Sequence, residues 1–164
     1  MNVVQYLTEK QVPFEACKHA VASCAERLAE AMHVDRKNVA KTVLLRVNGG
    51  FKYVLAILPG SHIIDLPKLS KALGGTHVEL ATKDEVAARC PDCEAGVLPP
   101  FGTQYCLESV IDPAVEVSEQ IVFEGNTHDE AIRMRYRDFY NLEHPLVAEF
   151  AVPADDRRMS SSAS

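Results

Sequence analysis

Lys41 and the loop DCEAGVLPPFG (residues 92–102) are the features of this sequence best suited to hold a small ligand. Lys41 stands between a polar turn and an apolar stretch that begins at Thr42, so a rigid strand end would carry its ammonium group. Lysines at such places are commonly only solvated. In the loop, the two prolines lack a backbone N–H, and glycine adopts conformations closed to other residues. The loop is therefore either a rigid connector or a backbone surface shaped around something small.

Cys90 and Cys93 form a CxxC motif, which occurs in zinc sites and in redox dithiols. A structural zinc site needs four ligands, and the sequence has no second CxxC or HxxxH to complete it. A redox CxxC normally opens a helix, whereas this one follows the end of a predicted helix. We therefore predict two ordinary thiols and no metal site. No spacing supports convergence of the other candidate ligands: Cys106, His62, His77 and His128.

Other catalytic motifs are absent from the sequence. It contains no G-x-S-x-G elbow, no Walker loop and no G-x-G-x-x-G fingerprint. No cysteine stands in a recognisable Cys-His protease context. Nothing in the residues therefore specifies a covalent nucleophile or a nucleotide cofactor.

The composition describes a soluble globular protein of one domain. Of the 164 residues, 47% are hydrophobic and 24% are charged, and no apolar run is long enough to span a membrane. The first residues do not read as a signal peptide, and five cysteines favour reduced thiols, so we expect a cytoplasmic protein. The net charge of −6 gives no general attraction to nucleic acid.

The elements that must position these residues alternate between helix and strand. Apolar spacing predicts helices over 2–11 and after a Ser23/Glu26 capping box, and Asp65 and a Thr82/Glu85 capping box predict two more, the second over 83–89. The runs 42–47 and 51–58, joined by Asn48-Gly49-Gly50, predict a β-hairpin. Strands are expected over 104–111, 120–124, 130–136 and 146–152, with a helix over 136–142. This pattern indicates an α/β or α+β fold with a mixed sheet. Residues 1–153 form the predicted domain and 154–164 a disordered tail.

Four segments together carry a family resemblance: AKTVLLRV (40–47), VLAILPGSHIIDLPKLSKAL (54–73), CEAGVLPPFG (93–102) and FEGNTHDEAIRM (123–134). In this order they resemble the YbaK family, the free-standing relatives of the editing domain inserted in bacterial prolyl-tRNA synthetases. The resemblance runs from the first helix to about residue 150. Its more specific parts are the lysine before Thr42 and the Gly-x-x-x-Pro run followed by Phe-Gly.

The resemblance implies aminoacyl-tRNA deacylation, the hydrolysis of the ester that joins a wrong amino acid to tRNA, without metal or organic cofactor. It implies Lys41 as the active-site residue and a pocket around the aminoacyl group. It also implies a compact domain with a mixed, partly barrel-like sheet. The loop residues that it assigns to the pocket are Gly96, Val97, Leu98, Pro99, Pro100, Phe101 and Gly102.

The GNTH segment and several cations are secondary candidates. Gly125, Asn126 and His128 fall where the family has a turn near the pocket, although Gly125-Asn126 also reads as a plain β-turn. The expected partner is the acceptor end of a mischarged aminoacyl-tRNA, where single-stranded contacts matter more than bulk charge. A tRNA synthetase or an elongation factor is a further possible partner, and no membrane is expected. Phosphates would be held by Lys18, Arg36, Lys37, Lys68 and Lys71.

Two other functions stay open at this point. The first is a non-catalytic module of the same fold that binds aminoacyl-tRNA or a free amino acid without hydrolysing it. The presence of Lys41 argues against that alternative. The second is a small metal- or redox-dependent protein built on Cys90 and Cys93, which one equivalent of zinc per chain would reveal.

Overall fold

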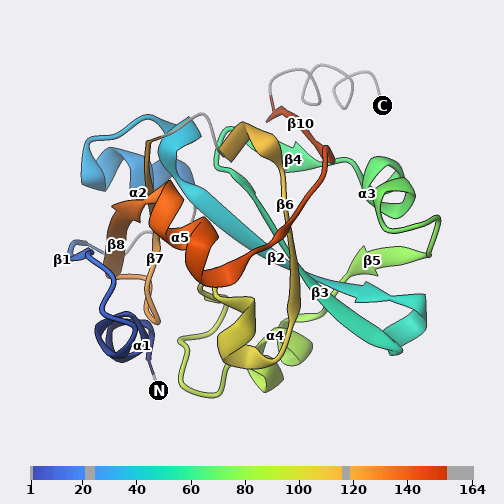
Figure 1. Ribbon diagram of the computed structural model, residues 1–164, viewed down its shortest axis with the longest axis horizontal. Coiled ribbons are helices and arrows are strands. Elements are labelled where there is room, and N and C mark those ends of the chain that lie inside the picture. Colours follow the sequence, from blue (N-terminus) through green and yellow to red (C-terminus); the bar gives the residue numbers. More distant parts are fainter. Residues whose placement is uncertain (1, 21–24, 116–118, 155–164) are drawn as a thin grey trace.

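A long hairpin forms the centre of the computed structural model, which describes residues 2–20, 25–115 and 119–154. Its strands β2 (Ala40–Val47) and β3 (Lys52–Pro59) cross the molecule diagonally in Figure 1. They belong to a five-stranded sheet of order β5-β2-β3-β6-β9. Strand β5 (Val78–Leu80) is antiparallel to β2, whereas β6 (Glu108–Ile111) and β9 (Leu146–Val147) run parallel to their neighbours. The predicted hairpin and the predicted mixed sheet are confirmed.

Two smaller sheets flank the hairpin. Strands β1 (Glu15–Lys18), β8 (Glu130–Arg135) and β7 (Gln120–Glu124) form an antiparallel sheet in that order. Strand β10 (Ala151–Pro153) pairs with β4 (His62–Ile64). A single parallel bridge between Val39 and Val122 joins the region just before β2 to β7. This bridge brings the end of β7 to the start of the hairpin.

Five helices surround the sheets in the part of the chain that the structure describes. They are α1 (Val3–Glu9), α2 (Ala25–Met32), α3 (Leu66–Ala72), α4 (Lys83–Arg89) and α5 (Tyr136–Glu143). Asp65 caps α3 and the Thr82/Glu85 capping box begins α4, as predicted from the sequence. The predicted Ser23 cap of α2 lies outside the described residues. Short 3₁₀ turns occupy Arg36–Asn38, Asn48–Gly50, Gly102–Tyr105 and Pro113–Val115.

Several predicted boundaries were wrong. The strand expected over 104–111 begins only at Glu108, because Gly102–Tyr105 form a 3₁₀ turn and Cys106 adopts a left-handed conformation with φ of 58°. The strand expected over 146–152 is divided into β9 and β10. Strands β1, β4 and β5 have no counterpart among the strands predicted from the sequence. Of the predicted tail, Ala154 still donates to Ser61 O at 3.0 Å, and residues 155–164 lie outside the described ranges.

The hairpin is buried on both faces, which explains its continuous apolar sequence. Alternate residues of each strand enter different clusters, as the two-residue period of a strand requires. Leu44, Leu55 and Ile57 belong to the larger core, whereas Leu45 and Leu58 belong to the core beneath α3. The start of β2 is therefore held rigidly. No helix within the described ranges combines the length and apolar character that crossing a membrane requires.

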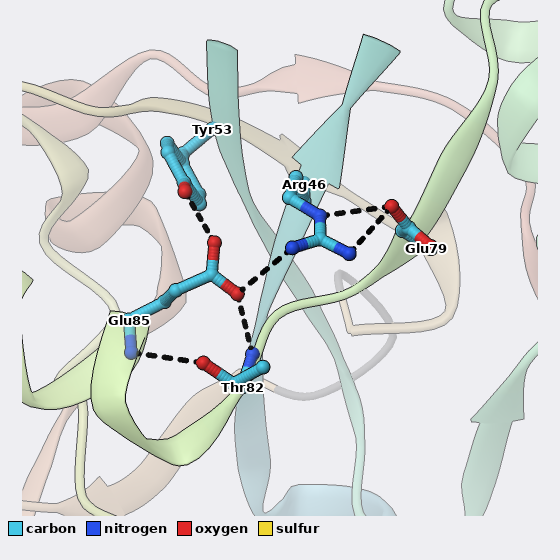
Figure 2. A network of polar contacts seen from close by, with 5 residues as sticks. All are labelled: Arg46, Tyr53, Glu79, Thr82 and Glu85. Carbon is cyan, nitrogen blue, oxygen red and sulfur yellow. Dashed lines mark hydrogen bonds and ion pairs between the residues drawn. The ribbon is translucent and has the colours of Figure 1, made fainter. Parts of the chain in front are cut away.

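A polar network fastens α4 to the hairpin (Figure 2). Arg46 of β2 contacts Glu79 of β5 at 2.7 Å and Glu85 of α4 at 3.5 Å. Tyr53 of β3 donates its hydroxyl hydrogen to the Glu85 carboxylate, and this hydrogen bond lowers the pKa of Glu85. Since α4 leads directly into the loop of residues 90–102, the network fixes where that loop starts.

Asp112 holds the last part of the chain against the sheet. Its carboxylate is buried and accepts hydrogen bonds from Phe150 N at 2.9 Å, Ala151 N at 2.8 Å and Ala114 N at 2.8 Å. These bonds turn the backbone between β9 and β10 and seat the fully buried Phe150 in the core beneath α3. The division of the predicted last strand follows from this carboxylate.

We predict that Asp112→Ala destabilises the protein by about 2–4 kcal/mol, because one buried and two partly buried N–H groups lose their carboxylate acceptor. Chemical denaturation of the purified variant measures this loss. Glu149→Ala is the control, since Glu149 is exposed beside the same segment. A loss no larger than that of the control would contradict the assigned role of Asp112.

Candidate active site

Lys41 opens onto a small pocket at the start of β2. The cavity volume is about 70 Å³. Its walls come from α2, β2, the end of β7 and the loop of residues 94–100, called the Gly96 loop below. These segments are far apart in the sequence. The lining residues are Ala25, Leu28, Val39, Ala40, Lys41, Thr42, Gly96, Val97, Leu98, Pro100, Phe123 and Glu124.

The Lys41 side chain is partly buried and has no counter-ion among the residues that the structure describes. Burial lowers the pKa of Lys41, and the nearby positive charge of Arg36 lowers it further. An ammonium group that burial partly removes from water is costly to keep without a counter-ion. It is, however, well placed to stabilise negative charge that develops on a bound ligand.

The Gly96 loop, residues 94–100, is attached to the strands on both sides of the pocket. Thr42 donates its hydroxyl hydrogen to Leu98 O, which fixes the loop beside Lys41. On the other side, Glu94 N donates to Asn126 O at 2.7 Å. Within the loop, Val97 N donates to Glu94 O at 3.0 Å, and Gly96 has a φ of 84° that L side chains rarely adopt. The loop is thus a shaped surface and not a plain connector.

His128 connects the loop to the end of β7. Its Nδ1 lies 2.8 Å from Glu124 Oε2, and its Nε2 lies 2.9 Å from Ala95 O. Burial alone would lower the pKa of His128, but the hydrogen bond to Ala95 and the Glu124 carboxylate outweigh it and raise this pKa. Burial raises the pKa of Glu124, against an opposing effect of His128. The imidazole therefore links a pocket carboxylate to the loop backbone.

The structure brings five of the predicted site residues to this pocket and places the others around it. The pocket is lined by Lys41, Gly96, Val97, Leu98 and Pro100. Pro99 is buried beside them and is not in the lining. His128 supports the loop through Ala95, without lining the pocket itself.

The remaining predicted residues serve the scaffold. Phe101 is fully buried, packs edge-on against Phe123 and Phe139, and does not itself line the pocket. A side chain at Gly102 would meet Leu107 O at 2.6 Å, so this glycine allows close backbone packing. Gly125 N bonds Glu130 O, and buried Asn126 accepts from Val3 N at 2.8 Å. These residues support the backbone around the site and do not line the pocket.

Seven residues of the lining were not predicted from the sequence: Ala25, Leu28, Val39, Ala40, Thr42, Phe123 and Glu124. Glu124 ends a predicted strand and Leu28 lies on the apolar stripe of a predicted helix, so both have ordinary explanations in the sequence. The one available signal was the position of Glu124 in the segment FEGNTH, directly before the candidate turn. The other missed residues reach the pocket only through tertiary contacts, which leave no local pattern in the sequence.

Cys90 and Cys93 form a disulfide, which corrects the prediction of two free thiols. The loop bends directly after α4 and brings their Cα atoms to 5.3 Å, within the usual range for a disulfide. Asn126 Nδ2 lies 3.4 Å from Cys93 Sγ, so the bridge borders the residues that anchor the Gly96 loop. In this form neither sulfur is the thiolate that a zinc ion binds.

The mixed sheet, the surrounding helices and the lysine-bearing pocket define a YbaK-like α/β domain. A model of the family described as "Aminoacyl-tRNA editing domain" matches residues 19–142. The chain belongs to this family.

Similar proteins include enzymes of tRNA charging. The chain is 31% identical over 103 residues to a proline–tRNA ligase of Trichlorobacter lovleyi, covering 63% of this chain and 18% of the ligase. It is 28% identical over 101 residues to an Enterococcus faecalis protein named "Putative Cys-tRNA(Pro)/Cys-tRNA(Cys) deacylase EbsC", covering 60% of this chain and 61% of that protein. The matches thus span less than two thirds of each relative.

A crystal structure described as that of a "putative trans-editing enzyme for prolyl tRNA synthetase" shares the fold. Its TM-score is 0.77 at 20% sequence identity, over 91% of this chain and 94% of that one. At this identity the likeness establishes the fold alone. The compact YbaK-like architecture expected from the sequence is confirmed.

We predict that Lys41→Met stabilises the protein, raising the melting temperature by about 2–4 °C at neutral pH. The apolar side chain removes the cost of a half-buried unpaired charge. The pKa of Lys41 is 10.5 in the unfolded chain and lower in the folded protein. Between these two pKa values the unfolded state binds more protons than the folded state, so the stability of the native protein rises with pH. The advantage of the variant should therefore shrink as pH rises through this range.

Thermal melts across this pH range measure the effect. Lys71→Met, at an exposed position on α3, is the matched control and should change little. A lower melting temperature for Lys41→Met at neutral pH would contradict the burial argument.

Proposed function

We propose that this protein is an aminoacyl-tRNA deacylase that acts in trans on mischarged tRNA. The observation that carries the proposal is the Lys41 ammonium, which has no counter-ion among the described residues, in one small pocket with the Gly96 loop. Membership of the editing family and the similarity to a protein named as a putative Cys-tRNA deacylase support the same reaction class. The substrate is the acceptor end of the tRNA, and we propose that the protein works in the cytoplasm, alone or beside a synthetase or elongation factor.

The chemistry follows from the charge that develops in ester hydrolysis. Attack by water on the ester carbonyl produces an oxyanion, which the Lys41 ammonium would stabilise. In the described part of the chain, Val97 N already donates to Glu94 O, whereas Gly96 N and Leu98 N carry no hydrogen bond. Both residues line the pocket, so we assign these two N–H groups as donors to the same oxyanion. The ribose hydroxyl beside the ester would help to place the water, so no metal or cofactor takes part.

The pocket walls would act as a sieve for the aminoacyl side chain. The cavity is small, and the side chains of Leu28, Val97, Leu98 and Phe123 close it. A methylene group changes binding in such a pocket by only about 1–3 kcal/mol, which is why synthetases rely on a second, hydrolytic selection. We therefore propose that small aminoacyl groups are the substrates.

Hydrolysis of a panel of mischarged tRNAs tests this proposal. We expect release of small amino acids by the native protein, also in the presence of EDTA, and a drop of roughly 10²–10³ in rate for Lys41→Ala. Lys83→Ala, at an exposed position on α4 outside the pocket lining, should behave as the native protein. Binding of aminoacyl-tRNA without any hydrolysis would instead support the non-catalytic alternative.

Changes to the loop should alter selectivity. Leu98→Ala enlarges the cavity, so we expect hydrolysis of bulkier aminoacyl-tRNAs to rise relative to small ones. Because Leu98 is 7% exposed, the variant should also lose about 2–4 kcal/mol of stability. Rates are therefore compared below the melting temperature of the variant. An unchanged ranking of substrates would show that Leu98 does not form the sieve.

A further inference from the structure

The pocket that holds Lys41 also holds a carboxylate, that of Glu124 at the end of β7. It is the one acidic side chain in the pocket lining as the described residues define it. Its charged partner is His128, at 2.8 Å, and no lysine or arginine of the described ranges forms an ion pair with it. Lys41 and Glu124 therefore line one cavity without pairing with each other. A pocket with a separated cation and anion suits a ligand that carries both a negative and a positive pole.

His128 holds the Glu124 carboxylate in a fixed orientation. A carbonyl oxygen can only accept, so the 2.9 Å contact with Ala95 O requires a proton on His128 Nε2. The other ring nitrogen, Nδ1, lies 2.8 Å from Glu124 Oε2, so the two groups share one proton, and the raised pKa of His128 favours its place on the imidazole. His128 N also donates to Glu94 Oε2 at 2.9 Å, which fixes the ring from its own backbone.

These contacts leave the second carboxylate oxygen for a ligand. Within the described part of the chain, Oε2 is taken by His128, and no hydrogen bond occupies Oε1. Glu124 is only partly buried, with 24% of its side chain exposed, so this oxygen can meet a group in the cavity. Its natural complement is a cation with several hydrogen-bond donors.

An aminoacyl ester carries such a group one carbon from its reacting carbonyl. We propose that Glu124 Oε1 binds the α-ammonium group of the aminoacyl moiety while Lys41 faces the ester carbonyl, so that the site requires a free α-amine. This inference rests on the proposed deacylase function. The site would then distinguish aminoacyl-tRNA from N-acylated aminoacyl-tRNA and peptidyl-tRNA, whose nitrogen is a neutral amide.

The test compares one aminoacyl-tRNA with the same molecule acetylated on its α-nitrogen. We expect the native protein to prefer the free amine by about 10- to 100-fold in kcat/KM, the range of one charge-assisted hydrogen bond. Glu124→Gln keeps an oxygen for His128 but removes the charge, so the rate on the free amine should fall and the preference should largely disappear. Glu124→Asp keeps the charge and should retain part of the preference. Glu108→Gln, an exposed carboxylate on β6, is the matched control.

The preference ratio separates this role from a structural one. If Glu124 only supported the loop through His128, Glu124→Gln would lower both rates alike and leave the ratio unchanged, which would overturn the inference. Failure of the native protein to hydrolyse any aminoacyl-tRNA would overturn the proposed function first. Hydrolysis by the native protein without any preference for the free amine would overturn this inference alone.

Binding supplies a readout independent of turnover. A 3′-aminoacylamino analogue of the terminal adenosine has an amide in place of the ester and is not hydrolysed as an ester. Calorimetry should show that the native protein binds this analogue about 10-fold or more tightly than its N-acetyl form, and that Glu124→Gln loses the difference. Equal affinities in the native protein would contradict the proposal.

Discussion

The site depends on the attachment of an irregular loop to strands that are themselves rigid. Residues 94–100 have no ladder of their own, and their geometry comes from contacts on two sides. Thr42 holds Leu98 to β2, whereas His128 and Asn126 hold Ala95 and Glu94 to the turn after β7. Because the Val39–Val122 bridge joins those two regions, the loop spans a gap whose width is fixed. The pocket exists because the loop cannot collapse onto β2.

The rigid hairpin holds the charged Lys41 side chain in place. The Lys41 ammonium is half-buried and meets no counter-ion in the described part of the chain, which destabilises the folded state, and the surrounding core must offset that cost. The two apolar faces of β2 and β3 supply this stability directly beneath Lys41. The charge is thus kept where ester hydrolysis would use it, at the expense of stability.

The disulfide and the α4 network act on the same loop from its other end. Cys90 and Cys93 close the first turn of the segment, and Glu85 ties α4 to Arg46 and Tyr53 (Figure 2). The loop therefore has a defined start as well as two lateral attachments. This arrangement explains why a segment with exposed residues at Glu94, Ala95 and Gly96 still presents buried walls at Val97 and Leu98.

Local chemistry in the sequence determined much of the framework. Capping at Asp65 and Thr82, the Asn48-Gly49-Gly50 turn and the apolar runs of the hairpin act over a few residues, so they could be predicted without a fold. The motif pattern likewise indicated Lys41 and the Gly96 loop.

Tertiary structure alone decided which side chains meet at the pocket. Phe101 belongs to the same motif but packs into the aromatic core, and Glu124 resembles an ordinary strand end until His128 turns it to the cavity. Short strands such as β1 and β5 escaped prediction because long-range pairing, and not their own period, stabilises them.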